Sequence, residues 1–93
     1  MVHNVYYDGA IQSIGFDSDE GEATVGVVKP GTYTMPTDCV EHITMLSGSG
    51  RVKIGEQDVR VFNRGDLIVL PANVEVVWEI PPGADTCYIC HFK

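Results

Sequence analysis

The fold is decided by residues 31–50, which read GTYTMPTDCVEHITMLSGSG, and by residues 65–73, which read GDLIVLPAN. In both segments β-branched, aromatic and other apolar residues form runs of strand length, and Gly or Pro closes the runs. The same pattern continues outside them, so we expect strands at residues 10–16, 22–28, 32–35, 42–46, 50–54, 57–62, 67–70, 74–80 and 86–92. No segment requires a helix, and evenly spaced short strands without helices predict an all-β barrel or sandwich.

The length of 93 residues allows one hydrophobic core, because a chain of this size buries only about 60% of its unfolded surface. Hydrophobic residues make up 44% of the chain and charged residues 20%, which is close to the usage of ordinary globular domains. We therefore expect a single folded domain over residues 1–93.

The charge of the chain excludes two classes of partner. Thirteen acidic residues against six Lys and Arg give a formal net charge of −7, which repels nucleic acids and anionic membranes.

The first ten residues, MVHNVYYDGA, lack the features of a signal peptide, and no apolar run approaches the roughly 20 residues that span a bilayer. Because an odd set of three cysteines also fits a reducing compartment, we expect a cytoplasmic protein.

The two quoted segments resemble the two sequence motifs of the cupins. The first cupin motif has a Gly, two His separated by one residue, a Glu and, after six residues, a Gly; Glu41 and Gly48 match its second half. The second motif has a Gly, five residues, a Pro, and then a Gly and a third His; Gly65 and Pro71 match its first half. The resemblance implies a single small cupin barrel, the double-stranded β-helix or jelly-roll fold.

The metal-binding histidines of the cupin motifs are absent from this chain. Counting back from Glu41 puts Met35 and Thr37 at the His pair, whereas counting forward from the first Gly gives Thr37 and Cys39. The third His position holds Val76. Because a transition metal needs about three or four N, O or S ligands, Glu41 alone cannot hold one, and we expect no metal and no other cofactor.

A second resemblance covers nearly the whole chain. It rests on the order and spacing of five stretches, Ser13–Phe16, Ala23–Val27, Gly31–Thr34, Glu41–Gly48 and Tyr88–Cys90. These are similar to the small cupins called pyrimidine/purine nucleoside phosphorylases. The resemblance implies a compact barrel, often dimeric, that acts without metal on many nucleosides and inorganic phosphate, giving free base and ribose 1-phosphate.

Glu41 is the candidate catalytic residue. Phosphorolysis passes through an oxocarbenium-like state, which needs a positioned phosphate, held ribose hydroxyls and help for the departing base. A carboxyl group can accept hydrogen bonds from ribose hydroxyls or, with its pKa raised by burial, act as a general acid toward the base. The alternative is a salt-bridged or rim carboxylate without a chemical role.

Strand alternation predicts which side chains accompany Glu41. Side chains on a strand point to alternate faces, so if Glu41 points into the barrel, Ile43 and Met45 point inward as well. His42 and Thr44 then face away, and His42 is not the partner of Glu41.

Five residues complete the candidate substrate site: Tyr33, Met35, Met45, Tyr88 and His91. Tyr33 and Met35 precede the Glu41 strand and either contact a base or pack in the core. His91 stands next to the last Cys, where the family that the chain resembles tends to carry an Arg. A protonated His can bind an oxyanion, and the alternative is an exposed residue at a chain terminus.

The string from Cys87 to Cys90 has the C-x-x-C spacing of some zinc and redox sites. Residues three apart on a strand face opposite sides, so the two sulfurs cannot easily share one metal. We expect ordinary buried or half-buried thiols.

The near-continuous apolar run from Val74 to Ile80, which includes the single Trp78, predicts a strand covered on both faces. One cover is the core, and the other is a second copy of the chain, because small monomers rarely expose large apolar patches. We therefore expect a homodimer.

The sequence leaves two main functions open and makes a third the weakest. The chain is either the enzyme described above or a non-catalytic cupin that has lost its metal site and binds a small ligand or a protein. A cationic group near Glu41 favours the enzyme. A metal-dependent cupin oxygenase or isomerase is the weakest alternative because the His positions are empty.

Overall fold

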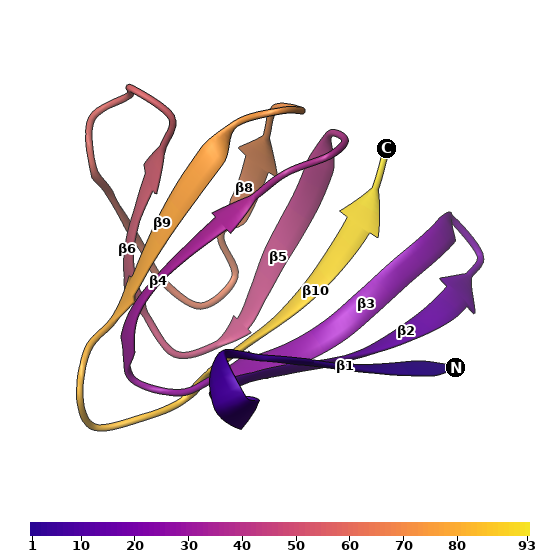
Figure 1. Ribbon diagram of the computed structural model, residues 1–93, viewed down its shortest axis with the longest axis horizontal. Helices are drawn as coiled ribbons and strands as arrows, with labels where there is room; N and C mark the ends of the chain where they lie inside the picture. The colour runs from indigo at the N-terminus through magenta and orange to yellow at the C-terminus, as the bar shows by residue number, and fades with distance from the viewer.

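The computed structural model, which describes residues 1–93, consists of two facing antiparallel β-sheets (Figure 1). The six-stranded sheet has, in spatial order, β1 (Val2–Tyr6), β2 (Ile11–Ser18), β3 (Gly21–Val28), β10 (Thr86–Phe92), β5 (Glu41–Ser47) and β8 (Leu67–Leu70). The four-stranded sheet has β4 (Gly31–Pro36), β9 (Glu75–Ile80), β6 (Gly50–Ile54) and β7 (Arg60–Phe62). The predicted all-β class is confirmed.

The N-terminal strand β1 was missed by the sequence analysis. It pairs with β2 from Val2 opposite Gly15 to Tyr6 opposite Ile11, and a single 3₁₀ turn, η1 (Tyr7–Gly9), joins the two strands. None of the residues of β1 is fully buried. Because β1 does not contribute to the core, its sequence lacks the apolar alternation that marks the other strands.

The C-terminal strand β10 lies in the middle of its sheet, between β3 and β5 (Figure 1). The register between β10 and β5 shifts after Cys87, so that Cys87 faces Ser47 while Tyr88 faces Met45. Leu46 is thus the extra residue of a β-bulge. The regular register from Tyr88 to Phe92 places the side chains of Tyr88 and Met45 on the same inner face.

The hydrophobic core lies between the two sheets. Its largest fully buried members are Phe62, Met45, Ile68 and Leu70. Phe62 packs against Trp78 edge to face, with ring centroids 5.8 Å apart, as aromatic pairs prefer.

Strand β9 differs from the sequence expectation. Val76 and Ile80 are buried, and Trp78 packs against the core beside them. The outer side of β9 carries Glu75 and Glu79, and Glu79 forms an ion pair of 3.3 Å with Arg51. Val76, Trp78 and Ile80 therefore supply the barrel interior, and the outer face of this strand carries two glutamates and Val77. The prediction that a second copy covers an apolar outer face of β9 is therefore corrected, because strand alternation puts Glu75 and Glu79 on that face.

Thr37, which stands at one of the empty His positions, holds two loops together. Its buried hydroxyl donates to the carbonyl oxygen of Pro71 at 2.7 Å and accepts from the backbone N–H of Val74 at 3.1 Å. The backbone N–H of Thr37 also donates to the carbonyl oxygen of Val74 at 2.9 Å. This hydroxyl is a structural clamp.

We expect Thr37→Val to lower the free energy of unfolding by about 1–3 kcal/mol, because the backbone N–H of Val74 and the carbonyl oxygen of Pro71 lose their hydrogen bonds to the hydroxyl. Chemical denaturation measures the loss. Thr34→Val is the matched control, since Thr34 is exposed on β4, and its effect should stay within about 0.5 kcal/mol. Equal stability of the two variants would show that the clamp contributes nothing.

Candidate functional site

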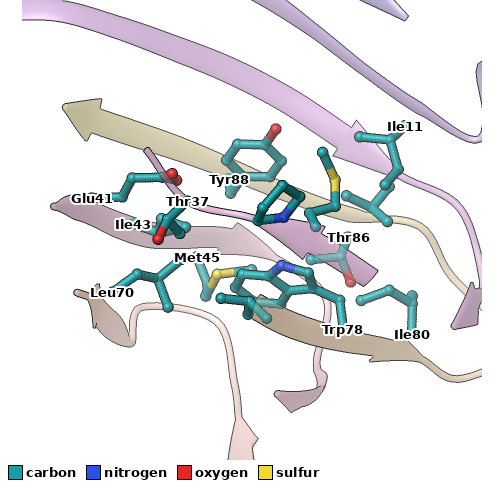
Figure 2. Close-up of a pocket in the computed structure, with 14 residues that line it drawn as sticks. Ile11, Thr37, Glu41, Ile43, Met45, Leu70, Trp78, Ile80, Thr86 and Tyr88 are labelled. Atoms are coloured by element: carbon teal, nitrogen blue, oxygen red, sulfur yellow. The ribbon is translucent and has the colours of Figure 1, made fainter. Parts of the chain in front are cut away.

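A narrow apolar cavity of about 110 Å³ lies between the two sheets (Figure 2). Most of its lining is hydrophobic and includes Met35, Met45 and Trp78. Glu41 and Thr86 are among the few side chains that bring polar atoms to it. The cavity is thus an apolar space with a carboxyl group at its edge, the kind of site that takes a mostly apolar ligand.

A wider groove of about 730 Å³ opens beside the cavity. It lies over the inner side of β1, β2 and β3, which spread to one side of the barrel away from β6 (Figure 1). Its polar lining includes Asn4, Ser13 and Thr24. The groove and the cavity share four lining residues, Met35, Pro36, Glu41 and Tyr88, so the two spaces meet there.

Glu41 begins β5 and is half-buried where the cavity and the groove meet. The thiol of Cys90 donates a hydrogen bond to its Oε1, with Sγ 3.4 Å away, and Glu41 forms no ion pair. Burial raises the pKa of the Glu41 carboxyl; the thiol hydrogen bond lowers it, and the charge of Asp38 raises it. The side chain is therefore not the salt-bridged carboxylate of the alternative interpretation, and its environment favours the protonated acid.

Cys90 and Cys87 lie on opposite faces of β10, as alternation predicts. Cys90 is buried beside Glu41, whereas Cys87 lies opposite Val27 and Ser47 and is half-buried. Burial, the charge of Glu41 and the hydrogen bond to Glu41 raise the pKa of the Cys90 thiol far above its usual value. The thiol is therefore a hydrogen-bond donor and a poor nucleophile.

No three or more His, Cys, Asp or Glu side chains come together in a way that could hold a metal ion. Met35, Thr37 and Val76, which stand at the His positions of the cupin motifs, all line the cavity. The residues present at the cupin metal position therefore do not fit a transition metal.

The structure brings together four of the six predicted site residues: Glu41, Met35, Met45 and Tyr88 line the cavity. Ile43 lines it as well, so the predicted alternation along β5 is confirmed.

Tyr33 does not line the cavity. It is buried, with its hydroxyl 2.8 Å from the carbonyl oxygen of Lys29 and 3.1 Å from that of Pro30. Its ring packs edge to face on Tyr7, with centroids 5.2 Å apart. Tyr33 therefore closes the turn before β4. Of the two roles considered for this residue, the structure shows packing in the core.

His91 lies on the other side of the sheet from Glu41. In register it faces His42 and Ala23 on the outer face, and its Nε2 is 3.9 Å from the Glu20 carboxylate. Strand alternation explains this correction, because His91 follows the inward-facing Cys90.

Trp78 is the cavity residue that the sequence analysis did not select. The sequence analysis placed it on a strand covered on both faces without choosing a face for it, and the structure shows that it lines the cavity opposite Tyr88 (Figure 2). Its position two residues from both Val76 and Ile80 is the signal that identifies it as inward-facing.

Comparison with known proteins identifies the relatives of this chain. The sequence model of the family described as pyrimidine/purine nucleoside phosphorylase matches residues 1–92. A Yersinia enterocolitica protein of that name is 40% identical over 91 residues, which are 96% of this chain and 94% of the relative.

Solved structures share the fold. An Acinetobacter protein described as of unknown function superposes with a TM-score of 0.90 at 28% identity, over 100% of this chain and 90% of that one. A cupin-2 domain from Rhodospirillum rubrum superposes with a TM-score of 0.73 at 19% identity, over 87% of this chain and 57% of that one, which shows the fold alone. The predicted cupin barrel is confirmed, and the chain belongs to the pyrimidine/purine nucleoside phosphorylase family.

Proposed function

We propose that this protein is a metal-independent phosphorylase of broad specificity, which converts purine and pyrimidine nucleosides and inorganic phosphate into free base and ribose 1-phosphate. The observation that carries the proposal is Glu41, a half-buried carboxyl group with a raised pKa at the junction of an apolar cavity and a polar groove. The family of the chain supports the same activity.

Glu41 acts in this mechanism as a general acid. In the transition state the bond between the anomeric carbon and the base nitrogen breaks, and the acid transfers its proton to the departing base. A phosphate oxygen forms the new bond to the anomeric carbon. The acidic proton of the phosphate then returns to the carboxylate, so the enzyme ends the cycle as it began. Burial raises the Glu41 pKa, which increases the fraction of the protonated form that the mechanism requires.

One observation favours the non-catalytic alternative. No Lys, Arg or His side chain lines either the cavity or the groove. Phosphate is held in proteins by cationic side chains or by clusters of backbone N–H groups. A protein that only binds nucleosides or similar small molecules needs no such cation.

Incubation of the purified protein with uridine, adenosine, inosine and guanosine, with and without phosphate, decides between these functions. Base release that requires phosphate and yields ribose 1-phosphate supports the phosphorylase. Release without phosphate points to a hydrolase, and nucleoside binding without any release supports the binding protein.

We also propose that two copies of the chain associate through the outer face of the six-stranded sheet. One register row on this face runs across five strands and is apolar apart from a single Thr; it consists of Ile14, Val25, Ile89, Thr44 and Leu67. Val27 and Val69 in the neighbouring rows are 44% and 46% exposed. The other sheet presents charged residues on its outer face, so the apolar sheet is the face that a second copy would cover.

A cytoplasmic location is a further proposal. All three cysteines are free, which fits a reducing compartment. None of the helical segments of the structure is long or apolar enough to cross a membrane.

Glu41→Gln removes the acid while it preserves the shape, and we expect kcat for phosphorolysis to fall by about 10²- to 10⁴-fold. In the wild type, activity should fall as the pH rises through the raised pKa of Glu41, because the acid is then lost; the variant should lack this dependence. Steady-state kinetics over a pH series measures both effects.

Stability separates a chemical role of Glu41 from a structural one. A raised pKa means that the stability linked to the protonated carboxyl is lost as the pH rises through that pKa, so Glu41→Gln should be at least as stable as wild type at neutral pH. Glu75→Gln, on the exposed side of β9, is the control and should keep wild-type turnover. Wild-type turnover in folded Glu41→Gln would refute the acid role.

We expect no stoichiometric transition metal in the purified protein, because Met35, Thr37 and Val76 supply no suitable ligand set with Glu41. Elemental analysis after chelator treatment, with activity measured before and after, checks this. One retained equivalent of iron, zinc, manganese or nickel, whose removal abolishes activity, would overturn the metal-independent mechanism.

We expect a dimer in sedimentation experiments at micromolar concentration. Stable interfaces bury more than about 1,000 Å² in total, so the dimer should survive moderate dilution. Val27→Lys places a charge on the proposed interface and should shift the mass toward the monomer. Val61→Lys is the matched control, because Val61 is 70% exposed but lies on β7 of the other sheet. A wild-type protein with only the monomer mass, or equal effects of both substitutions, would contradict the proposed interface.

A further inference from the structure

A row of inward-facing residues crosses the six-stranded sheet and ends in the cavity. Asn4 faces Ser13, Ser13 faces Gly26, Gly26 faces Tyr88, and Tyr88 faces Met45. Residues directly opposite one another in antiparallel strands share a face of the sheet, so all five positions face the same way. Along this row the polar groove over β1 and β2 passes into the apolar cavity over β5.

Gly26 makes room for the ring of Tyr88. A Cβ atom at residue 26 would lie 2.5 Å from both Cζ and the hydroxyl oxygen of Tyr88, which is closer than real Cβ contacts come. The backbone of Gly26 is not in the left-handed region, so steric space and not conformation explains the glycine here. The phenol ring therefore lies across β3, and its hydroxyl reaches toward β2.

The hydroxyl of Tyr88 is held on the groove side. The side chain of Ser13 lies near it and lowers its pKa slightly, and the Nδ2 of Asn4 donates to the Oγ of Ser13 at 3.3 Å. In Figure 2 the hydroxyl points away from Trp78 and out of the cavity. Burial is the main reason that the pKa of Tyr88 is raised to about 12, so the group remains a protonated hydroxyl at neutral pH.

Tyr88 thus presents different chemistry to the two spaces. Its carbon ring lines the cavity together with Trp78 and Met45, and its hydroxyl faces the groove. About 10–15 Å³ of such a space holds one water molecule, so a cavity of about 110 Å³ has room for a nucleobase ring but not for a whole nucleoside. The groove, at about 730 Å³, has room for the rest.

We propose that the cavity is the subsite for the nucleobase, that the groove is the subsite for the ribose, and that Gly26 determines this division by allowing Tyr88 to lie between the two. The inference rests on the proposed function. The flat base contacts Trp78, Met45 and the Tyr88 ring, while the Tyr88 hydroxyl bonds to the sugar. The bond to be broken then lies at the shared mouth, beside Glu41.

The single tryptophan provides a direct test of the base subsite. Trp78 is the only tryptophan of the chain and it lines the cavity, so its fluorescence reports on that space alone. Titration with uracil or adenine should change the emission in a saturable way, and ribose 1-phosphate should leave it nearly unchanged. Each base should also inhibit phosphorolysis in competition with the nucleoside.

Tyr88→Phe tests the role assigned to the hydroxyl. We expect KM for uridine to rise by about 2- to 12-fold, the loss that one hydrogen bond carries, while the response of Trp78 to free uracil stays unchanged. Tyr7→Phe is the matched control: its hydroxyl bonds to the backbone of Thr34, outside the cavity and the groove, and both readouts should remain at wild-type values.

Gly26→Ala and Tyr88→Ala form a double-mutant cycle that tests the role of Gly26. Gly26→Ala should raise KM for uridine by about tenfold or more, because the new methyl group displaces Tyr88. In the Tyr88→Ala background the same change should have little further effect, since the ring that it displaces is gone. Tyr88→Phe still tests the division of the site if Gly26→Ala does not fold. Equal effects of Gly26→Ala in both backgrounds would show that it acts without Tyr88.

The outcomes separate this inference from the proposed function. Binding of free base at Trp78 without phosphorolysis keeps the base subsite and removes the phosphorylase. Phosphorolysis with a silent Trp78 at inhibitory concentrations of base, or with unchanged KM in Tyr88→Phe, keeps the phosphorylase and overturns the division proposed here.

Discussion

Backbone pairing of β10 with β3 on one side and β5 on the other holds the six-stranded sheet together. Without it, β1, β2 and β3 would be separate from β5, which carries Glu41. The same pairing puts Cys90 within hydrogen-bond reach of Glu41 and sets Tyr88 between Gly26 and Met45. The central position of β10 therefore determines both the surroundings of Glu41 and the position of Tyr88 between the cavity and the groove.

The interior of this barrel shows how a cupin fold without the motif histidines keeps a pocket. Two of the positions that correspond to metal ligands now carry Met35 and Val76, which make the cavity apolar. The third, Thr37, uses its hydroxyl to join two loops. Glu41 has no cationic side chain beside it, and burial raises its pKa. The cavity thus keeps one half-buried acid among apolar residues.

Strand alternation predicted much of this architecture from the sequence. It placed Glu41, Ile43 and Met45 on one face, because one face of β5 is buried and a strand has a strict period of two. The same rule, applied to β9 and β10, would have turned Trp78 inward and His91 outward. Other features leave no local signal. The groove depends on β1, which has no buried residue, and the fit of Tyr88 over Gly26 depends on a register that no single segment contains.

The order in which the chain is synthesised matters for such a sheet. Strand β10 is the last to leave the ribosome, yet it occupies a central place between strands made much earlier. Until it arrives, β3 and β5 each present an open edge of unpaired backbone groups, which is a template for association between nascent chains. Folding of this barrel is therefore complete only after β10 has been synthesised, and a product truncated before residue 86 would be an aggregation-prone fragment with two unpaired edges.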